Sequence, residues 1–199
     1  EFVKLVPSRT EGNPLFIGEV IRMLEQEGAA ARDDASVRLP EGVREVIGRR
    51  LNRLTEPCNR ALTVASVIGR EFTLDQLMRV VDDLSESRLL EVLEEALSAR
   101  VIEELQDSVG RYQFTHALIR QTLEDELSTT RRVRLHARIA HALEDGYEDE
   151  VDQHAAELAH HFGEAEAVLG IDKLVRYSVV AGGHALSRHA WEEASDHLQ

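Results

Sequence analysis

His116 is the residue whose type and position best suit binding chemistry. It follows Phe114 and Thr115, where an alternating stretch gives way to a helical pattern, and Thr115 is placed as the N-cap of that helix. An imidazole N–H can donate to a phosphate oxygen, and a helix N-terminus adds unpaired N–H groups and positive partial charge. His116 is therefore a candidate phosphate contact, and its alternative role is that of a capping or packing histidine.

A second candidate site is the stretch Gly12-Asn13-Pro14, which precedes a predicted helix that ends near Gly28. Gly12 lets the backbone approach a ligand closely, and Pro14 offers a rigid apolar face at the first helical position. The same residues also suit a plain turn followed by a helix start, so the motif alone leaves both roles open.

Three histidines, His154, His160 and His161, lie close together in the sequence. His154 and His161 are seven positions apart and share a helix face, whereas His160 does not. No His-Glu-x-x-His motif or cysteine pair accompanies them. We therefore expect no metal site.

No catalytic set is apparent in the sequence. It contains no Gly-x-x-x-x-Gly-Lys-Ser/Thr loop, no strand followed by acidic residues for Mg²⁺, and no Ser/His/Asp or Cys/His set at suitable spacing. We expect the chain alone neither to hold nucleotide nor to hydrolyse ATP, so no residue is assigned a catalytic role.

The elements that position these residues are expected to be mainly helical. Apolar residues recur at helical spacing in the segments 14–28, 40–54, 57–68, 74–81, 87–99, 115–127 and 128–144. The one convincing β signal is a hairpin, with an apolar run at 101–105, a turn at 107–110, and the alternating Tyr112 and Phe114. Helices, then a hairpin, then a helix outline a winged helix.

Local signals also predict where single elements begin and end. Residues 69–71 suit a turn, Thr73 is placed to cap the helix 74–81, and Ser85 or Ser87 to cap the next one. The buried stripe of that next helix is expected to be Leu89, Leu90, Leu93 and Leu97. From Val151 onward, small residues alternate with large ones on successive helices, which is typical of tetratricopeptide-like (TPR-like) α-solenoids.

Composition excludes some classes of function. The formal net charge is −14, and the helix 87–99, which would read DNA in a DNA-binding winged helix, is acidic, so direct nucleic-acid binding is not expected. The four arginines between Arg131 and Arg138 are expected to be solvated or paired with carboxylates. A single cysteine, Cys58, suits a small buried position in a reducing cytoplasm. No apolar run is long enough to span a membrane.

Several motifs, in a fixed order, carry a family resemblance. TEGN before PLF, then VIGREF, then YQFTHALIRQTL followed by RRVRLHARIAHALE, resemble the middle of STAND-class signalling ATPases. That class includes LuxR-family transcriptional regulators and cyclase-associated regulators with an AAA-type ATPase domain. The resemblance covers nearly the whole chain, and we expect the 199 residues to be part of a longer protein.

The resemblance implies a fold and a site. The fold is mainly α, with a winged-helix domain containing one small β-hairpin, followed by a TPR-like helical solenoid. Residues 1–28 correspond to the end of a helical lid, 38–127 to the winged helix, and 128–199 to the first repeats. In this class the counterparts of Gly12 and Pro14 contact the nucleotide, and the counterpart of His116 contacts the diphosphate of ADP in the closed state. Glu124 departs from the aromatic residue common in relatives.

The resemblance also implies cofactors and partners. ADP or ATP, with Mg²⁺, would be held by an upstream NTPase domain of the same chain, and a protein or small-molecule inducer would act on the repeats. A homo-oligomer and an effector for transcription or cyclase control are part of the same expectation. Two alternatives stay open, namely a DNA-binding winged-helix regulator and a helical-repeat scaffold that binds a partner protein without nucleotide.

Overall fold

The computed structural model describes residues 43–106 and 108–187, which fall in two compact units divided between Thr55 and Glu56. Gly12 and Pro14, with the whole predicted helix 14–28, lie outside the described residues. The predicted domain boundaries, at 28, 38 and 127, stay predictions.

The first unit contains one described helix, α3, which spans Val43–Leu51. Ile47 and Leu51 are buried, and so is Leu54 just beyond the helix end. Their spacing is the helical one that the sequence predicts for this segment.

The second unit is mainly helical and carries a three-stranded antiparallel sheet. In chain order it contains α4 (Glu56–Ile68), β1 (Glu71–Thr73), α5 (Leu74–Val80), α6 (Glu86–Ser98), β2 (Ile102–Glu104), β3 (Arg111–Phe114), α7 (Ala117–Asp125), α8 (Thr129–Tyr147), the 3₁₀ helix η2 (Glu148–His154), α9 (Ala155–Glu164), α10 (Glu166–Leu169) and α11 (Asp172–Ser187).

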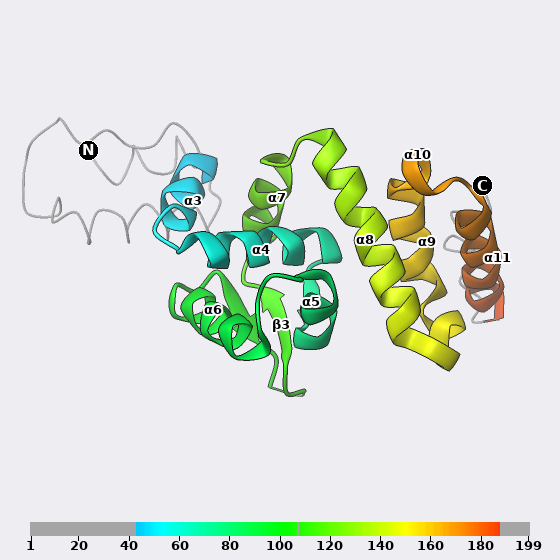
Figure 1. Ribbon diagram of the computed structural model, residues 1–199, viewed down its shortest axis with the longest axis horizontal. Coiled ribbons are helices and arrows are strands. Elements are labelled where there is room, and N and C mark those ends of the chain that lie inside the picture. The colour runs from blue at the N-terminus through cyan, green and yellow to red at the C-terminus, as the bar shows by residue number, and fades with distance from the viewer. Residues whose placement is uncertain (1–42, 107, 188–199) are drawn as a thin grey trace, which may run out of the picture. The chain divides into compact units, whose positions relative to one another are not determined.

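Helix α4 is the centre of the first half of this unit. It contacts α5, α6, α7 and α8, and Figure 1 shows the strand β3 below it, between α5 and α6. Cys58, Ala61 and Ala65 on α4 are buried, as the sequence predicts. Small side chains on a central helix let its neighbours approach closely, which explains how one helix can contact four others.

The sheet contains the predicted hairpin of β2 and β3, and a further strand, β1, which pairs with the other edge of β3. The prediction of a turn at 69–71 is wrong at Glu71, where β1 begins. Three residues are too few to show the alternation that marks a strand. Phe72 pairs with Tyr112 across the ladder, so β1 forms because its partner strand lies beside it.

The two faces of the sheet differ in polarity. Phe72, Tyr112 and Phe114 are buried on one face, with ring centroids 5.8 Å apart for Phe72 and Tyr112 and 5.7 Å apart for Phe72 and Phe114. On the other face Arg111 pairs with Glu71, and Gln113 donates to Glu103. One apolar and one polar face explain the alternation seen in the sequence.

The predicted helix caps are confirmed at Thr73 and Ser85, whose hydroxyls accept from backbone N–H groups of α5 and α6. The predicted stripe of α6 is only partly correct. Leu90 is exposed and Leu97 is half-buried, whereas Val92 and Ala96 are buried beside Leu89 and Leu93. The helical period is followed more closely by positions 89, 92, 93 and 96 than by the four leucines of the predicted stripe.

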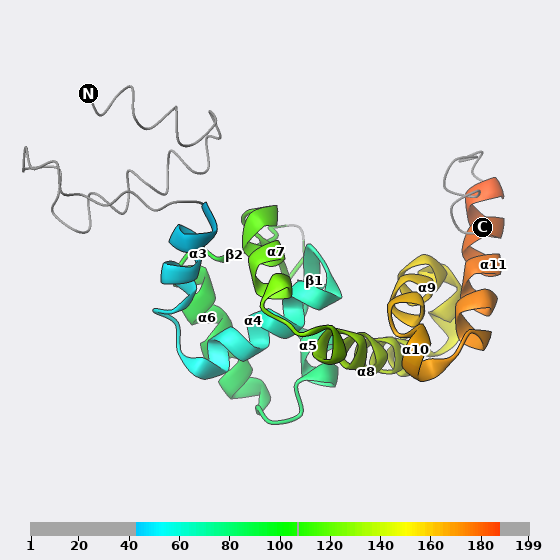
Figure 2. The same cartoon turned by 90° about the horizontal axis from the view of Figure 1, so that it is seen from above.

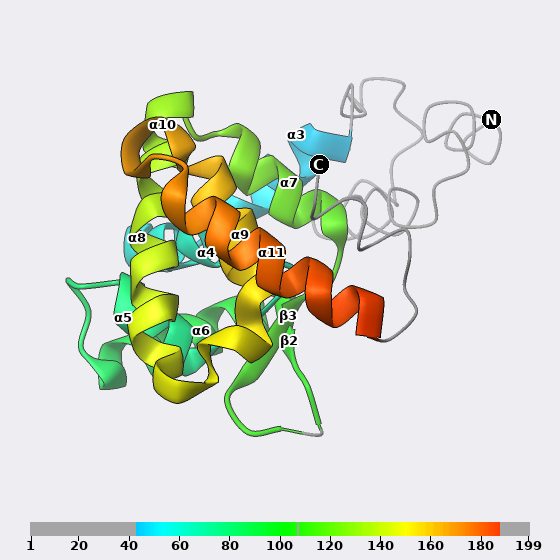
Figure 3. The ribbon, with the colours of Figure 1, turned by 90° about the vertical axis from the view of Figure 1, so that its right-hand side faces the viewer.

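Helix α8 links the sheet region to the last helices. It packs against α4 and α5 and also against α9, and α9 packs against α11. Figure 2 shows α8 running from α5 to α10, and Figure 3 shows α11 crossing α9. Leu158, Phe162 and Tyr177 are buried between these helices, with Phe162 and Tyr177 stacked at 5.6 Å. Of the helices the structure describes, none has the length and apolar character that crossing a membrane requires.

Candidate functional site

His116 lies where β3 passes into α7. The strand ends at Phe114, and His116 occupies the N-cap position with extended backbone angles (φ −148°, ψ 138°). Its side chain is exposed and makes no capping hydrogen bond. His116 is therefore the N-cap residue of α7 by position, but its side chain makes no hydrogen bond to the helix.

Thr115, which the sequence predicts as the cap, has a different role. Its hydroxyl lies 2.9 Å from the carbonyl of Arg100 and 3.2 Å from that of Val101, and its N–H donates to Val101. The N-cap prediction is wrong by one residue because Thr115 still belongs to the hairpin side of the junction. These bonds attach the backbone directly before His116 to the two residues that precede β2.

The first turn of α7 suits an anion electrostatically. The first N–H groups of any α-helix lack partners within the helix, and they carry positive partial charge. No acidic residue occurs in this first turn. An exposed imidazole beside such a helix start can donate to a phosphate oxygen together with the backbone.

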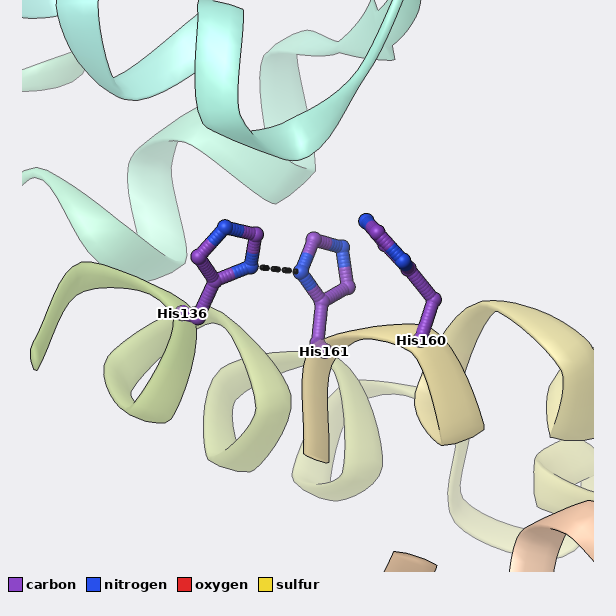
Figure 4. Close-up of side chains that lie close together, drawn as sticks. All are labelled: His136, His160 and His161. Carbon is purple, nitrogen blue, oxygen red and sulfur yellow. Dashed lines mark hydrogen bonds between the residues drawn. The ribbon is translucent and has the colours of Figure 1, made fainter. Parts of the chain in front are cut away.

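A second cluster of chemistry-bearing side chains lies between α8 and α9. His136 comes from α8, and His160 and His161 come from α9. Nδ1 of His136 lies 2.9 Å from Nδ1 of His161, and the ring of His160 lies beside both, with centroids 5.6 Å from His136 and 5.1 Å from His161 (Figure 4). Among the described residues, these three can each offer one nitrogen within 4.8 Å of the others.

This histidine cluster differs from the set that the sequence brings together. His154 is not part of it, because its ring stacks on Tyr147 at 3.7 Å. His136 takes its place, although it precedes His161 by 25 positions. A usable signal was present, since His136 falls on the buried stripe of α8 that continues through Ile139, Ala140 and Leu143.

Two members of the histidine cluster are buried and neutral. Burial, with the nearby His160 and Arg132, lowers the pKa of His136 to about 4 although Glu164 acts in the opposite direction. Burial, with the two neighbouring histidines, lowers the pKa of His161 to about 3. Both imidazoles therefore keep a lone pair at neutral pH. His160 is exposed and connects the pair to solvent.

One nitrogen of the histidine cluster lacks a well-formed hydrogen bond, and charged side chains lie near the cluster. Nε2 of His161 is buried without a well-formed hydrogen bond to any described residue, although the backbone of Ile68 lies close enough to influence its pKa. Burial raises the pKa of the Glu124 carboxyl, against the lowering effect of Arg120, Arg132 and, most weakly, His160. Near the cluster, Glu164 and Glu124 supply negative charge, Arg132 supplies positive charge, and Glu124 is itself paired with Arg120.

Comparison with protein-family models, with curated proteins and with solved structures gives no match for this chain.

Proposed function

We propose that this chain is the regulatory region of a STAND-type signalling protein, in which it couples a nucleotide-holding core to a helical sensor. His116 carries the proposal. It is exposed at the start of α7, it does not cap that helix, and no acidic residue in the first turn repels an anion. In this role its N–H donates to a phosphate oxygen of ADP beside the backbone N–H groups of α7.

The arrangement around His116 supports the proposed role. Thr115 is tied to Arg100 and Val101, so the histidine is carried on a junction fixed to the sheet. The three strands in the order β1-β3-β2, with α4, α5 and α6, suit a winged helix that acts as an internal brace. The packed helices α8, α9 and α11 suit the beginning of a TPR-like solenoid.

In this proposal the nucleotide supplies negative charge, and the chain's residues hold it. Gly12 and Pro14, by their resemblance to the lid motif, would contact the nucleotide from the N-terminal side. The closed state would then be the state in which His116 and its phosphate contact are engaged. A ligand that binds one of two states more tightly shifts the population toward it, so loss of this contact would favour the open state.

A DNA-binding role is less well supported. The helix α6 would enter the groove in such a role, and it exposes Glu86, Glu91 and Glu94. Its Arg88 pairs with Glu91. Phosphates would be repelled by this surface, because affinity for DNA comes largely from lysine and arginine contacts.

A helical scaffold without nucleotide is consistent with one observation on α11. Val175 and Val179, one turn apart, are 49% and 57% exposed, and Ile171 before them is 54% exposed. Such an apolar stripe on a helix suits contact with a further repeat or with a partner peptide. The stripe is equally compatible with the sensor of a signalling protein.

The experiment is a measurement of co-purifying nucleotide in the natural full-length chain. We expect bound ADP in the wild type, a clear loss in His116→Ala, and partial retention in His116→Asn, which keeps an N–H donor. The exposed His184 on α11 gives the matched control, and His184→Ala should retain ADP. Equal ADP content in His116→Ala and wild type would refute the proposed contact, and absence of nucleotide from the folded wild type would favour the scaffold.

A further inference from the structure

We propose that His136, His160 and His161 form a binding site for a divalent first-row metal ion, with Zn²⁺ as the ion whose chemistry fits best. The three imidazoles come from two packed helices and converge in one place. One nitrogen from each ring lies within 4.8 Å of the other two. Nothing in the proposed nucleotide role uses these residues.

The distances require only side-chain adjustment. With Zn–N bonds of about 2.0–2.1 Å, two nitrogens on a tetrahedral ion lie roughly 3.3 Å apart. Nδ1 of His136 and Nδ1 of His161 are already 2.9 Å apart. His160 is exposed, so its ring can turn toward the other two without any movement of α9.

In the buried pair of histidines, each ring has one nitrogen that faces the other ring and a second nitrogen that needs its own partner. Two neutral imidazoles facing each other through Nδ1 share one hydrogen, so one ring donates and the other accepts. In either arrangement Nε2 of His161 has no well-formed hydrogen bond to a described residue. Figure 4 shows that this second nitrogen faces His160. An imidazole gives only one nitrogen to an ion. With Nδ1 of His161 as the ligand, Nε2 keeps the proton, and the nearby backbone of Ile68 can accept it, as is usual for ligating histidines.

The buried histidines are in the neutral form that metal binding needs at neutral pH. A histidine ligand must be neutral, and a protonated one must first lose its proton. Burial keeps the pKa of His136 at about 4 and that of His161 at about 3. The two buried ligands are thus ready to bind without proton release.

The donor set selects the class of ion. Imidazole nitrogen suits Zn²⁺, Cu²⁺ and Ni²⁺, whereas Mg²⁺ and Ca²⁺ prefer oxygen ligands. Exposure of His160 leaves one side open to water as a fourth ligand. Glu164 acts electrostatically on His136 in the sense that attracts a cation, and Arg132 acts against it. The charge of Glu124 is already balanced by Arg120, which lies 2.9 Å away.

A bound ion would join α8 to α9 at one point. These helices belong to the junction between the sheet region and the final helices. Because the ligands come from positions 25 residues apart, only the folded chain brings them together. Binding therefore adds to the stability of the fold.

The experiment is calorimetric titration of the 199-residue chain with ZnCl₂, after removal of any affinity tag. We expect saturable binding of one ion per chain. His160→Ala should weaken it at least about tenfold, the scale reported for losing even an indirect metal partner. His184→Ala, an exposed histidine on α11, should leave it unchanged. Zn²⁺ should also raise the Tm of the wild type by more than that of His160→Ala, and Mg²⁺ should raise neither.

His160→Ala is the decisive variant because its side chain is exposed and its loss leaves the core intact. His136→Ala and His161→Ala should abolish binding, with circular dichroism to establish that each is folded. Absence of saturable Zn²⁺ binding by the wild type would overturn the proposal. So would an equal loss of affinity in His160→Ala and His184→Ala, which would indicate adventitious surface binding.

Discussion

The phenolic O–H of Tyr177 donates a 2.6 Å hydrogen bond to Oε1 of Glu144 and so joins α11 to α8. Lys173 on α11 pairs with the other carboxylate oxygen of Glu144. Burial raises the pKa of Glu144, but the hydrogen bonds from Lys173 and Tyr177 outweigh it, and the pKa is lowered overall. The contacts with Lys173 and Tyr177 therefore stabilise the charged form of the Glu144 carboxylate.

We expect Glu144→Gln to reduce the free energy of unfolding by about 1–3 kcal/mol at pH 7, the scale of a charged hydrogen bond. Because the folded-state pKa is lowered, this stability is present above the unfolded-state value of about 4.3. It is lost as the pH falls through the folded-state pKa. Urea denaturation from pH 7 down to about pH 2, through the range in which both forms of the carboxyl titrate, measures it, with Glu166→Gln as the exposed control. A deficit that stays constant to the lowest pH would contradict the assignment.

Helices and caps follow from local patterns, whereas contacts between distant residues do not. Thr73 is predicted as a cap from its residue type and its place directly before a helical pattern, and its partner Gln76 lies only three residues away. Glu144 and Tyr177 are 33 positions apart, and only the packing of α8, α9 and α11 brings them together. The same reason explains why β1 and the contact of His136 with His161 do not emerge from the sequence, since each depends on a partner from another element. Only the burial of His136 can be read from the apolar stripe of α8.

The capping box at the start of α5 allows a direct test of a local prediction. The Thr73 hydroxyl accepts from the N–H of Gln76 at 3.1 Å, and the Gln76 side chain accepts from the N–H of Thr73 at 2.8 Å. We expect Thr73→Ala to cost about 1 kcal/mol of stability. Thr73→Ser keeps the hydroxyl and should cost much less in the same thermal unfolding measurement. Equal losses in the two variants would show that the methyl group matters more than the cap.

Arg100 has a positive φ of 55° directly after the C-cap of α6. Its N–H donates to Leu97, and the next N–H, of Val101, donates to Ala96, which is the pattern that favours glycine at this position. We expect Arg100→Gly to be more stable than Arg100→Ala by about 1 kcal/mol. Both variants lose the same side chain, so their difference in chemical denaturation isolates the backbone term. A more stable alanine variant would contradict it.

Cys58 is fully buried on α4, and its Sγ lies 3.4 Å from the carbonyl of Val92 on α6. Burial, aided by the nearby charge of Glu95, raises the pKa of its thiol to about 12. The thiolate is the reactive form, so we expect almost no reaction with a thiol reagent at pH 8 under native conditions. The same reagent in denaturant should react fully. Rapid labelling of the native chain would mean that α4 and α6 separate readily.

The proposed role of His116 predicts that substitution of this residue leaves the stability of the fold unchanged. Its side chain is exposed and caps nothing, so we expect His116→Ala to change the free energy of unfolding by less than about 0.5 kcal/mol. Phe114, two residues earlier, is buried against Phe72, and Phe114→Ala should cost about 3–5 kcal/mol. Thermal and urea unfolding of both variants measure this contrast. A large loss in His116→Ala would mean that the histidine packs, and a fall in ADP retention could then no longer be attributed to a phosphate contact.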